Sequence, residues 1–174
     1  MKLHLIGLPG SGKTTLAAEL SSQLGVPHYD LDVVAYADER WTMRPERVRE
    51  ERVGQIRAEP GFVTEGHFLA WITPLLDAAD GVVWVDPPLR VLMWRQVRRF
   101  GLRRPGWLLA RLRFQVRCYR RPMGRGPVKD DPNLTRSGLE ITLRRWEDKV
   151  VRLRRPLSAP EVIATVGRLQ GGTT

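Results

Sequence analysis

Cysteine is almost absent from this chain of 174 residues, in which Cys118 is the one thiol. A single thiol cannot form an intrachain disulfide, and it excludes a zinc cluster built from several thiolates. Hydrophobic runs are also short, far below the roughly 20 residues that a membrane-spanning helix needs. Only six residues precede Gly7, which leaves no room for a signal peptide before it. These absences predict a cytoplasmic protein with no membrane partner.

Acidic residues are scarce in the second half of the chain. Over the whole sequence, 29 Lys and Arg stand against 19 Asp and Glu, which gives a net charge of +10. Residues 90–155 contain 20 basic and 5 acidic residues, a net charge of +15, whereas the rest of the chain has a net charge of −5. The asymmetry indicates that one region binds a polyanion. The alternative is a general preference for arginine over lysine, because only two of those 20 basic residues are lysines.

The remaining composition is typical of one globular domain, with 42% hydrophobic and 28% charged residues. Short apolar segments alternate with segments of helical periodicity. Strands are predicted at residues 2–6, 26–31, 61–65, 81–85 and 161–166. Helices are predicted at residues 13–24, 33–58 with a break near 44–45, 68–79 with an interruption near Pro74, 87–100, 107–116 and, from a capping box at Ser137, 137–153. This order predicts a single α/β domain over residues 1–174, with a doubly wound, five-stranded parallel sheet.

Residues 7–14 match the pattern G-x-x-x-x-G-K-[ST] without a mismatch, between an apolar strand and a predicted helix. Glycine leaves room for a phosphate to reach several backbone N–H groups, and the helix dipole adds to the attraction. Lys13 can bind the β- and γ-phosphates, and the Thr14 hydroxyl can bind Mg²⁺. The alternative is a chance glycine-rich turn. The residues predicted to bind ATP are Gly7, Pro9, Gly10, Ser11, Gly12, Lys13, Thr14 and Thr15.

Carboxylates end the next two predicted strands, at the edge where an open parallel sheet binds its ligands. Asp30 and Asp32 are two residues apart, so in an extended strand their side chains point the same way. Such a pair can hold a magnesium-bound water and orient an acceptor hydroxyl. The alternative for this pair, chiefly for Asp32, is a helix N-cap. Glu65 ends the third strand, where Gly66 permits a close approach of the ligand.

Two other polar residues follow strands but are not assigned to the core of the site. Asp86 ends the fourth strand and precedes Pro87, so a helix cap is at least as compatible with it as a metal role. His67 follows Gly66 and is interpreted as a solvated loop residue rather than as a base.

These residues resemble the small P-loop kinases, the relatives of adenylate kinase and shikimate kinase. The loop at residues 7–15 carries most of the likeness, and the Asp30-x-Asp32 spacing is similar to that of shikimate and gluconate kinases. Residues 65–68 and the arginine-rich helix after the fourth strand look most like DNA topology modulation proteins, an adenylate kinase-related group. A strict adenylate kinase is not expected, because residues 65–69 read Glu-Gly-His-Phe-Leu rather than Asp-Gly-Phe-Pro-Arg, and no four-cysteine zinc site is present.

The resemblance implies roles for residues outside the loop. It implies Asp30 near Mg²⁺ and Asp32 at the acceptor, with Glu65 and Gly66 on the acceptor side. Residues 33–58 become an acceptor-side helical segment and residues 101–133 a lid-like insertion. In the first of these segments, Trp41 can stack on an acceptor ring and Arg44 can pair with an anion. The arginines implied at the phosphates are Arg95, Arg98 and Arg99, with Arg103, Arg104 and Arg144 behind them, and the catalytic residues are Lys13, Asp32, Arg98 and Arg99.

The sequence thus predicts an ATP- and Mg²⁺-dependent kinase of a small acceptor that is nucleoside- or nucleotide-like. Two alternatives stay open. One is a P-loop nucleotide-binding protein that acts on nucleic acid, because Trp107, Phe114 and Tyr119 interleave with arginines in the basic region, although these rings fit a helix core equally well. The other is a kinase of a non-nucleotide small molecule.

Overall fold

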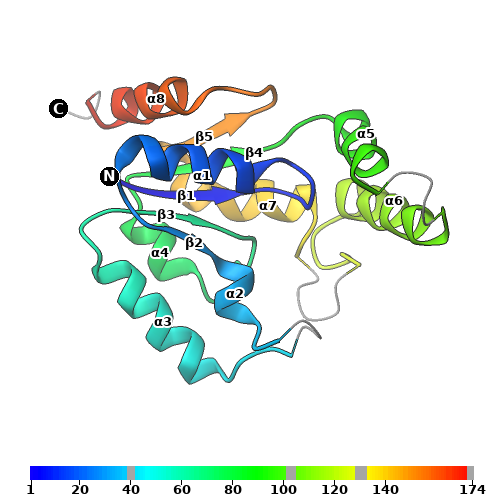
Figure 1. Ribbon diagram of the computed structural model, residues 1–174, viewed down its shortest axis with the longest axis horizontal. Coiled ribbons are helices and arrows are strands. Elements are labelled where there is room, and N and C mark those ends of the chain that lie inside the picture. The colour runs from blue at the N-terminus through cyan, green and yellow to red at the C-terminus, as the bar shows by residue number, and fades with distance from the viewer. Residues whose placement is uncertain (39–41, 101–104, 128–132, 172–174) are drawn as a thin grey trace.

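Five short strands form one parallel sheet in the order β2-β3-β1-β4-β5. The computed structural model describes residues 1–38, 42–100, 105–127 and 133–171 (Figure 1). The strands are β1 (Lys2–Ile6), β2 (His28–Asp30), β3 (Phe62–Glu65), β4 (Gly81–Val85) and β5 (Val150–Leu153). Because β1 pairs with both β3 and β4, the loop after β1 leaves the middle of the sheet edge. The doubly wound α/β fold predicted from the sequence is confirmed.

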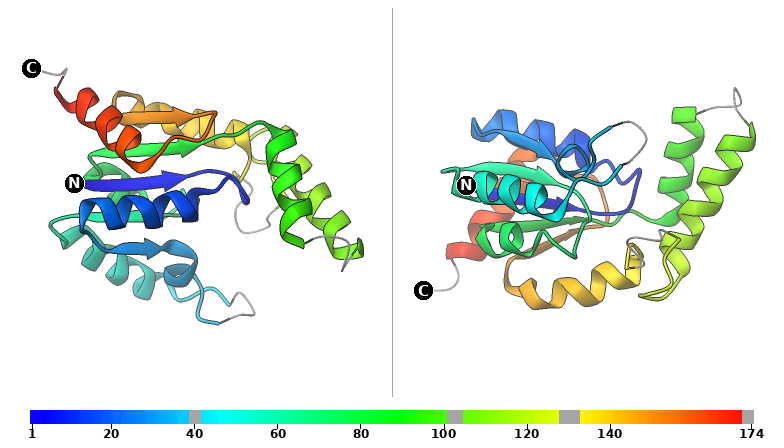
Figure 2. Two further views of the ribbon diagram at one scale, coloured as in Figure 1. Left: turned by 45° about the horizontal axis from the view of Figure 1, so that its top comes forward. Right: turned by 90° about the horizontal axis from the view of Figure 1, so that it is seen from below.

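Helices cover both faces of this sheet (Figure 2). They are α1 (Lys13–Leu24), α2 (Leu31–Ala35), α3 (Glu46–Ala58), α4 (Thr73–Ala78), α5 (Leu89–Phe100), α6 (Pro105–Arg120), α7 (Arg136–Thr142), the 3-10 helix η2 (Leu143–Lys149) and α8 (Ala159–Gly171). Helices α1 and α8 share one buried apolar cluster with the sheet, and α2, α3, α4, α7 and η2 share the other. Over the residues that the structure describes, none of these helices combines the length and hydrophobicity needed to cross a bilayer.

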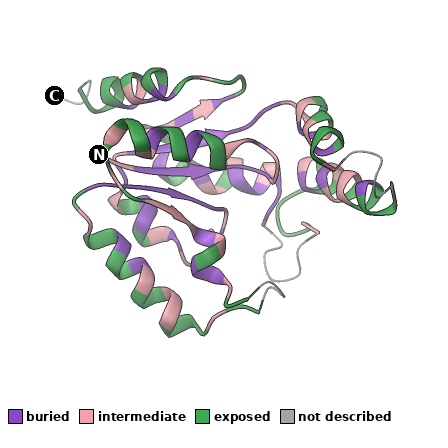
Figure 3. Ribbon diagram, in the orientation of Figure 1, coloured by how far each residue is buried: buried purple, intermediate pink, exposed green. Residues whose placement is uncertain are grey.

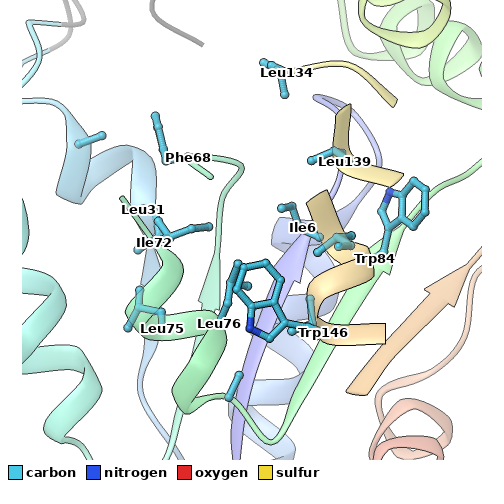
Figure 4. Packing of buried hydrophobic residues seen from close by; sticks show 14 of the residues in the cluster. Ile6, Leu31, Phe68, Ile72, Leu75, Leu76, Trp84, Leu134, Leu139 and Trp146 are labelled. Atoms are coloured by element: carbon cyan, nitrogen blue, oxygen red, sulfur yellow. The ribbon is translucent and has the colours of Figure 1, made fainter. Parts of the chain in front are cut away.

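The sheet is apolar because it is buried between these two layers. Every residue of β4 is buried, which explains its continuous hydrophobic run (Figure 3). At its start, a Cβ on Gly81 would lie 2.6 Å from Val166 of α8, so glycine lets this helix pack closely. On the other face, Trp146 packs in the same cluster as Leu76 (Figure 4), and its indole N–H donates to Asp77 Oδ1 at 2.8 Å.

The strand predicted at residues 161–166 is wrong, because these residues lie within α8. Its buried residues, Ala159, Val162 and Val166, recur every three or four positions, which is the period of a helix. A strand was predicted there because the segment is rich in β-branched side chains. The fifth strand is instead β5, at the end of the helix predicted from Ser137. That helix begins one residue earlier, after its N-cap Thr135, and it has become a 3-10 helix by Leu143.

The other predicted elements change mainly at their ends. The helix predicted at residues 33–58 is two helices, α2 and α3, between which an antiparallel bridge joins Tyr36 to Met43. The helix predicted at 68–79 begins only at Thr73, immediately before Pro74, because proline fits the first helical turn but not the interior. Helix α6 is longer than the predicted 107–116. Residues 121–127 form no helix or strand, and 128–132 lie outside the described residues.

Two arginines bind the carboxylate of Asp86, for which a helix cap and a metal role had been considered. Arg136 donates to both oxygens at 2.9 and 3.0 Å, and Arg152 donates two hydrogen bonds to Oδ2 at 2.9 and 2.7 Å. The Arg152 guanidinium also lies 3.9 Å from the centre of the Trp84 ring. Asp86 is buried, so these ion pairs link the end of β4 to α7 and β5.

We expect Asp86→Asn to lower the free energy of unfolding by about 2–3 kcal/mol, because it leaves two half-buried guanidinium groups without a full counter-charge. Glu140→Gln is the matched control, since Glu140 pairs with the same two arginines but its side chain is 42% exposed. This control is expected to lose less than about 1 kcal/mol. Urea denaturation measures both, and equal losses would contradict a central role for Asp86.

Candidate functional site

The loop between β1 and α1 has a backbone that only glycine adopts freely at two positions. Gly10 and Gly12 have φ angles of 81° and 92°, in the left-handed region. At Gly7, a Cβ would lie 2.5 Å from the carbonyl oxygen of Val85, so a side chain there would collide with β4. The loop therefore keeps the space free of side chains that a phosphate needs, and helix α1 begins at its last residues.

Lys13, at the start of α1, faces a buried carboxylate. Its Nζ lies 3.7 Å from Glu65 Oε2, and the Glu65 side chain is only 2% exposed. The other oxygen, Glu65 Oε1, lies 3.7 Å from His28 Nε2 on β2. Among the described residues no hydrogen bond reaches Glu65 Oε1, which leaves an acceptor atom directed into the site. Next to Lys13, Thr14 is exposed, so its hydroxyl is accessible to a metal ion.

Asp30 and Asp32 are close together, but not because both lie in one strand as predicted. Strand β2 ends at Asp30, which is the N-cap of α2, and Asp32 lies in the first turn of that helix. Asp30 Oδ1 accepts a hydrogen bond from the Asp32 backbone N–H at 2.8 Å. The capping role that seemed the main alternative for Asp32 therefore belongs to Asp30, and the Asp32 carboxylate is not used as a cap.

The pKa of Asp32 is raised to about 6, which shows how the site acts on this carboxyl. Burial is the largest cause, and the negative charges of Asp30 and Glu65 add to it. The positive charge of Lys13 opposes them. The four residues thus form one electrostatic cluster at the carboxyl ends of β2 and β3, in which Asp32 takes up a proton close to neutral pH.

Gly66 and His67 continue this cluster beyond β3. A Cβ on Gly66 would lie 2.8 Å from Leu31 Cβ, so glycine lets this turn pack against the first residue of α2. His67 lies in the loop after β3, as predicted, and it is half-buried rather than fully solvated. Burial and then the charge of Lys13 lower its pKa to about 3, and its ring stacks on Phe68 with centroids 4.7 Å apart. The imidazole is therefore neutral at physiological pH and can donate or accept a hydrogen bond beside Lys13.

Helix α5 brings Arg95, Gln96 and Arg99 to the loop. Arg95 Nη1 donates to the backbone carbonyl oxygens of Ser11 and Gly10. Gln96 is buried, and a Cβ on Gly10 would lie 2.5 Å from its Nε2, so it packs directly on the loop. These three side chains, Gly10 and residues 12–15 line a cavity of about 190 Å³. Gln96 was not predicted, although its position beside Arg95 on the same helix was a signal for it.

A second cavity of about 380 Å³ adjoins the loop on the β5 side. Ser11, Gly12 and Thr15 line it from the loop and α1, and Arg95 lines it from α5. The segment after β5 contributes Arg154, Arg155 and Pro156, which sequence reasoning missed because it placed these residues after a long helix. This cavity is apolar on most of its wall and has cations at its rim, as a nucleotide-binding pocket requires.

Other predicted site residues are not brought to the loop. Arg98 is exposed, packs its guanidinium over the Trp94 ring at 5.3 Å and lines neither cavity. Arg144 is exposed in η2 and also lines neither of the two cavities. The chain forms η2 and β5 where one continuous helix was predicted. Arg44 lies between α2 and α3, where its backbone N–H donates to Ala35. Trp41, Arg103 and Arg104 lie outside the described residues.

The residues present fit a nucleotide and a hard divalent cation. Gly10 and Gly12 hold the loop in left-handed conformations, and the buried Ser11 hydroxyl has no partner among the described residues. Oxygen ligands, which Mg²⁺ prefers, are offered by the Thr14 hydroxyl and the carboxylates of Asp30 and Asp32. Within the described part of the chain, no group of three His, Cys, Asp or Glu side chains forms a ready-made metal site. This pattern suits Mg²⁺ that shares its ligands with substrate phosphates.

Comparison with known proteins identifies kinases among the relatives of this chain, although no family model matches it. The cytidylate kinase of Aeropyrum pernix is 33% identical in an alignment of 110 residues, and the match covers 55% of this chain and 63% of that enzyme. The shikimate kinase of Paracidovorax citrulli is 53% identical over 34 residues, or 20% and 19% of the two chains. The chain thus spans less than two thirds of the length of either relative.

Solved structures resemble the chain over almost its whole length. Shikimate kinase from Acinetobacter baumannii, in complex with shikimate, has a TM-score of 0.54 and 17% identity and covers 99% of this chain and 94% of its own. Shikimate kinase from Aquifex aeolicus has a TM-score of 0.55 and 20% identity, and the match covers 99% of this chain and 97% of that one. A gluconokinase from Sinorhizobium meliloti has a TM-score of 0.55 and 16% identity, and the match covers 98% of this chain and 94% of that one. With its complete phosphate-binding loop and this sheet order, the chain therefore has the P-loop kinase fold of the shikimate kinase and gluconokinase structures.

Proposed function

We propose that this chain transfers the γ-phosphoryl group of ATP to a hydroxyl group of a small, nucleoside-like acceptor, in a reaction that depends on Mg²⁺. The observation that carries the proposal is the position of Lys13. Its Nζ, at the end of the phosphate-binding loop, lies 3.7 Å from the buried carboxylate of Glu65, and its charge acts on the partly buried carboxylate of Asp32. A group that binds the transferred phosphate thus faces a group that can remove a proton from the acceptor, as phosphoryl transfer requires.

Each group in the cluster has a chemical task. The backbone N–H groups of residues 10–15 bind phosphate oxygens, and Lys13 neutralises the charge that develops on them. Asp32 accepts the proton of the acceptor hydroxyl while the acceptor oxygen forms its bond to phosphorus and the bond from phosphorus to the β–γ bridging oxygen breaks. Bound Mg²⁺ would supply further charge neutralisation, held by the Thr14 hydroxyl and, through water, by Asp30. Arg95 and Arg99 on α5 lie where they can screen the phosphates.

Two features favour an uncharged, planar acceptor. Asp30, Asp32 and Glu65 make the acceptor side acidic, which repels a second phosphate group. Aromatic rings border the same side, because Tyr36 and His67 both pack on Phe68, with ring centroids 5.8 and 4.7 Å away. A nucleoside offers both a hydroxyl group and a planar base for such rings. The acceptor-side role of residues 33–58 and the lid-like role of residues 101–133 are part of this proposal.

Release of ADP from ATP tests the proposal. The assay uses purified protein with Mg²⁺ and a panel of cytidine, uridine, deoxynucleosides, CMP, shikimate and gluconate. Stimulation by nucleosides is the expected result. Stimulation by shikimate or gluconate alone would favour the non-nucleotide kinase instead. Turnover that responds only to oligonucleotides would favour the alternative of a nucleotide-binding protein that acts on nucleic acid. The resemblance to DNA topology modulation proteins is a prediction that supports this alternative.

A further inference from the structure

The hairpin of α5 and α6 has a charge that the proposed phosphoryl transfer does not explain. Between Asp86 and Asp130 the sequence contains no acidic residue, but it contains twelve arginines and Lys129. The two helices pack on each other and lie beyond the carboxyl ends of the strands (Figure 1). In the part of the chain that the structure describes, no ion pair joins an arginine of residues 87–127 to a carboxylate. A net positive charge of this size attracts anionic partners to the hairpin.

Only part of this charge faces the phosphate-binding loop. Arg95 and Arg99 line the cavity there together with the buried Gln96. Helical geometry turns each residue by about 100°, so Trp94 lies about 160° around α5 from Gln96. Arg90, Trp94 and Arg98 follow one another at intervals of four residues and form a stripe, all three exposed, on this outer side. This outer stripe cannot reach the phosphates of a nucleotide bound at the loop.

The outer stripe has the composition of a surface that stacks bases. Trp94 is 58% exposed, which is unusual for so large an aromatic side chain. Arg98 covers its ring at 5.3 Å, and Arg90 lies one turn before it. A cation, an aromatic ring and a second cation thus alternate within one stripe. An amphipathic membrane helix would instead separate its apolar residues from its basic residues.

Helix α6 adds to the same positive field. Arg113, Arg117 and Arg120 are exposed at spacings of four and three residues along it. Arg111 is partly buried within the hairpin, with its guanidinium within 6 Å of the centres of three aromatic rings. Burial and then the positive charge of Arg99 lower the pKa of Arg111, so the hairpin repels itself electrostatically. A bound polyanion would relieve that repulsion.

From this surface we infer that the outer face of the α5–α6 hairpin binds single-stranded nucleic acid, with a base stacked on Trp94 and the flanking phosphates paired with Arg90 and Arg98. Alternating cationic and aromatic contacts are the chemistry by which proteins hold single strands without reading their sequence. The inference does not depend on the proposed kinase activity, because the stripe lies away from the loop.

Fluorescence anisotropy with a labelled 20-nucleotide oligothymidylate tests the inference. The wild-type protein is expected to bind it, and affinity should fall about 50-fold between 50 and 200 mM salt if about four phosphates are neutralised. Trp94→Ala is expected to weaken binding roughly 5- to 100-fold, whereas Trp94→Phe keeps most of the affinity because it keeps an aromatic face. Circular dichroism melting confirms that both variants fold.

Matched charge changes separate the outer stripe from the general charge of the protein. Arg90→Gln with Arg98→Gln is expected to weaken binding at least tenfold and to reduce the salt dependence. Arg47→Gln with Arg168→Gln removes two exposed arginines elsewhere and should change affinity less than twofold. The inference is overturned if the oligonucleotide does not bind, if both charge pairs act alike, or if Trp94→Ala has no effect. It is also overturned if inorganic polyphosphate or anionic phospholipid vesicles bind at the hairpin and the oligonucleotide does not.

Discussion

Replacing Lys13 with alanine is expected to reduce acceptor-dependent ADP release at least 100-fold. Lys13 is the charged side chain at the end of the phosphate-binding loop, and losing one such group from a phosphoryl-transfer site typically costs two to three orders of magnitude in turnover. The fold should survive, because the Lys13–Glu65 ion pair is long at 3.7 Å, and its loss is expected to cost only about 1–2 kcal/mol of stability. Steady-state kinetics and thermal melting measure the two effects separately.

Lys149→Ala is the matched control for this variant. Its ammonium group binds the backbone carbonyl oxygens of Asp77 and Ala79, beside the start of β4 and therefore away from the loop. This variant removes the same charge and the same side chain but should keep turnover within about twofold. If Lys13→Ala retained full activity, or if both lysine variants lost activity equally, the loop would not be the site of phosphoryl transfer.

Replacing Asp32 with asparagine should change activity and stability in opposite directions. Turnover is expected to fall 100- to 10,000-fold, because asparagine cannot accept the proton of the acceptor hydroxyl. In the wild-type protein, turnover should rise with pH around a midpoint near 6, where Asp32 loses its proton. The variant should lose this rise, and kinetics between pH 5 and 8 measure both. A wild-type profile that is flat through pH 6 would contradict Asp32 as the proton acceptor.

The stability effect follows from the raised pKa of Asp32. Its pKa is about 6 in the folded chain and near 3.8 in the unfolded chain, so the folded state holds this proton more tightly. The contribution to stability is present below pH 3.8 and is lost as the pH rises through 6. Above pH 6, Asp32→Asn is therefore expected to be more stable than the wild type by about 1–2 kcal/mol, and the gain should shrink as the pH falls toward 4. Asp30→Asn is the control: asparagine also caps a helix well, so its stability should change by less than about 0.5 kcal/mol.

The sequence by itself determined the central part of this protein. Strands β1 and β4 and helix α1 begin and end where the pattern predicted, because short apolar runs, the glycine-rich loop and Gly25 at the end of α1 act over a few residues. The phosphate-binding loop was equally predictable, since its glycines and Lys13 form a continuous motif. The acidic ends of β2 and β3 followed from topology, because parallel strands present their carboxyl ends at one edge.

Only the tertiary structure decided which apolar segment became the fifth strand. Residues 150–153 and 161–166 contain two valines each, so both segments have a local preference for a strand. Pairing with β4 makes the first segment a strand, whereas packing of Val162 and Val166 on the sheet makes the second a helix. At 161–166 contacts between residues far apart in the sequence overrode local propensity, whereas at 150–153 they agreed with it and ended the predicted helix.

The tertiary structure likewise decided what each arginine does. Spacing along the chain placed Arg95, Arg98 and Arg99 on one helix, but it did not show that Arg98 turns outward onto Trp94. Nor did spacing along the chain show that Asp86 forms ion pairs with Arg136 and Arg152, which come from two other elements. The physical reason is that a guanidinium group on a long side chain pairs with whatever the fold brings near it. The backbone of a glycine-rich loop, in contrast, is decided by its own residues.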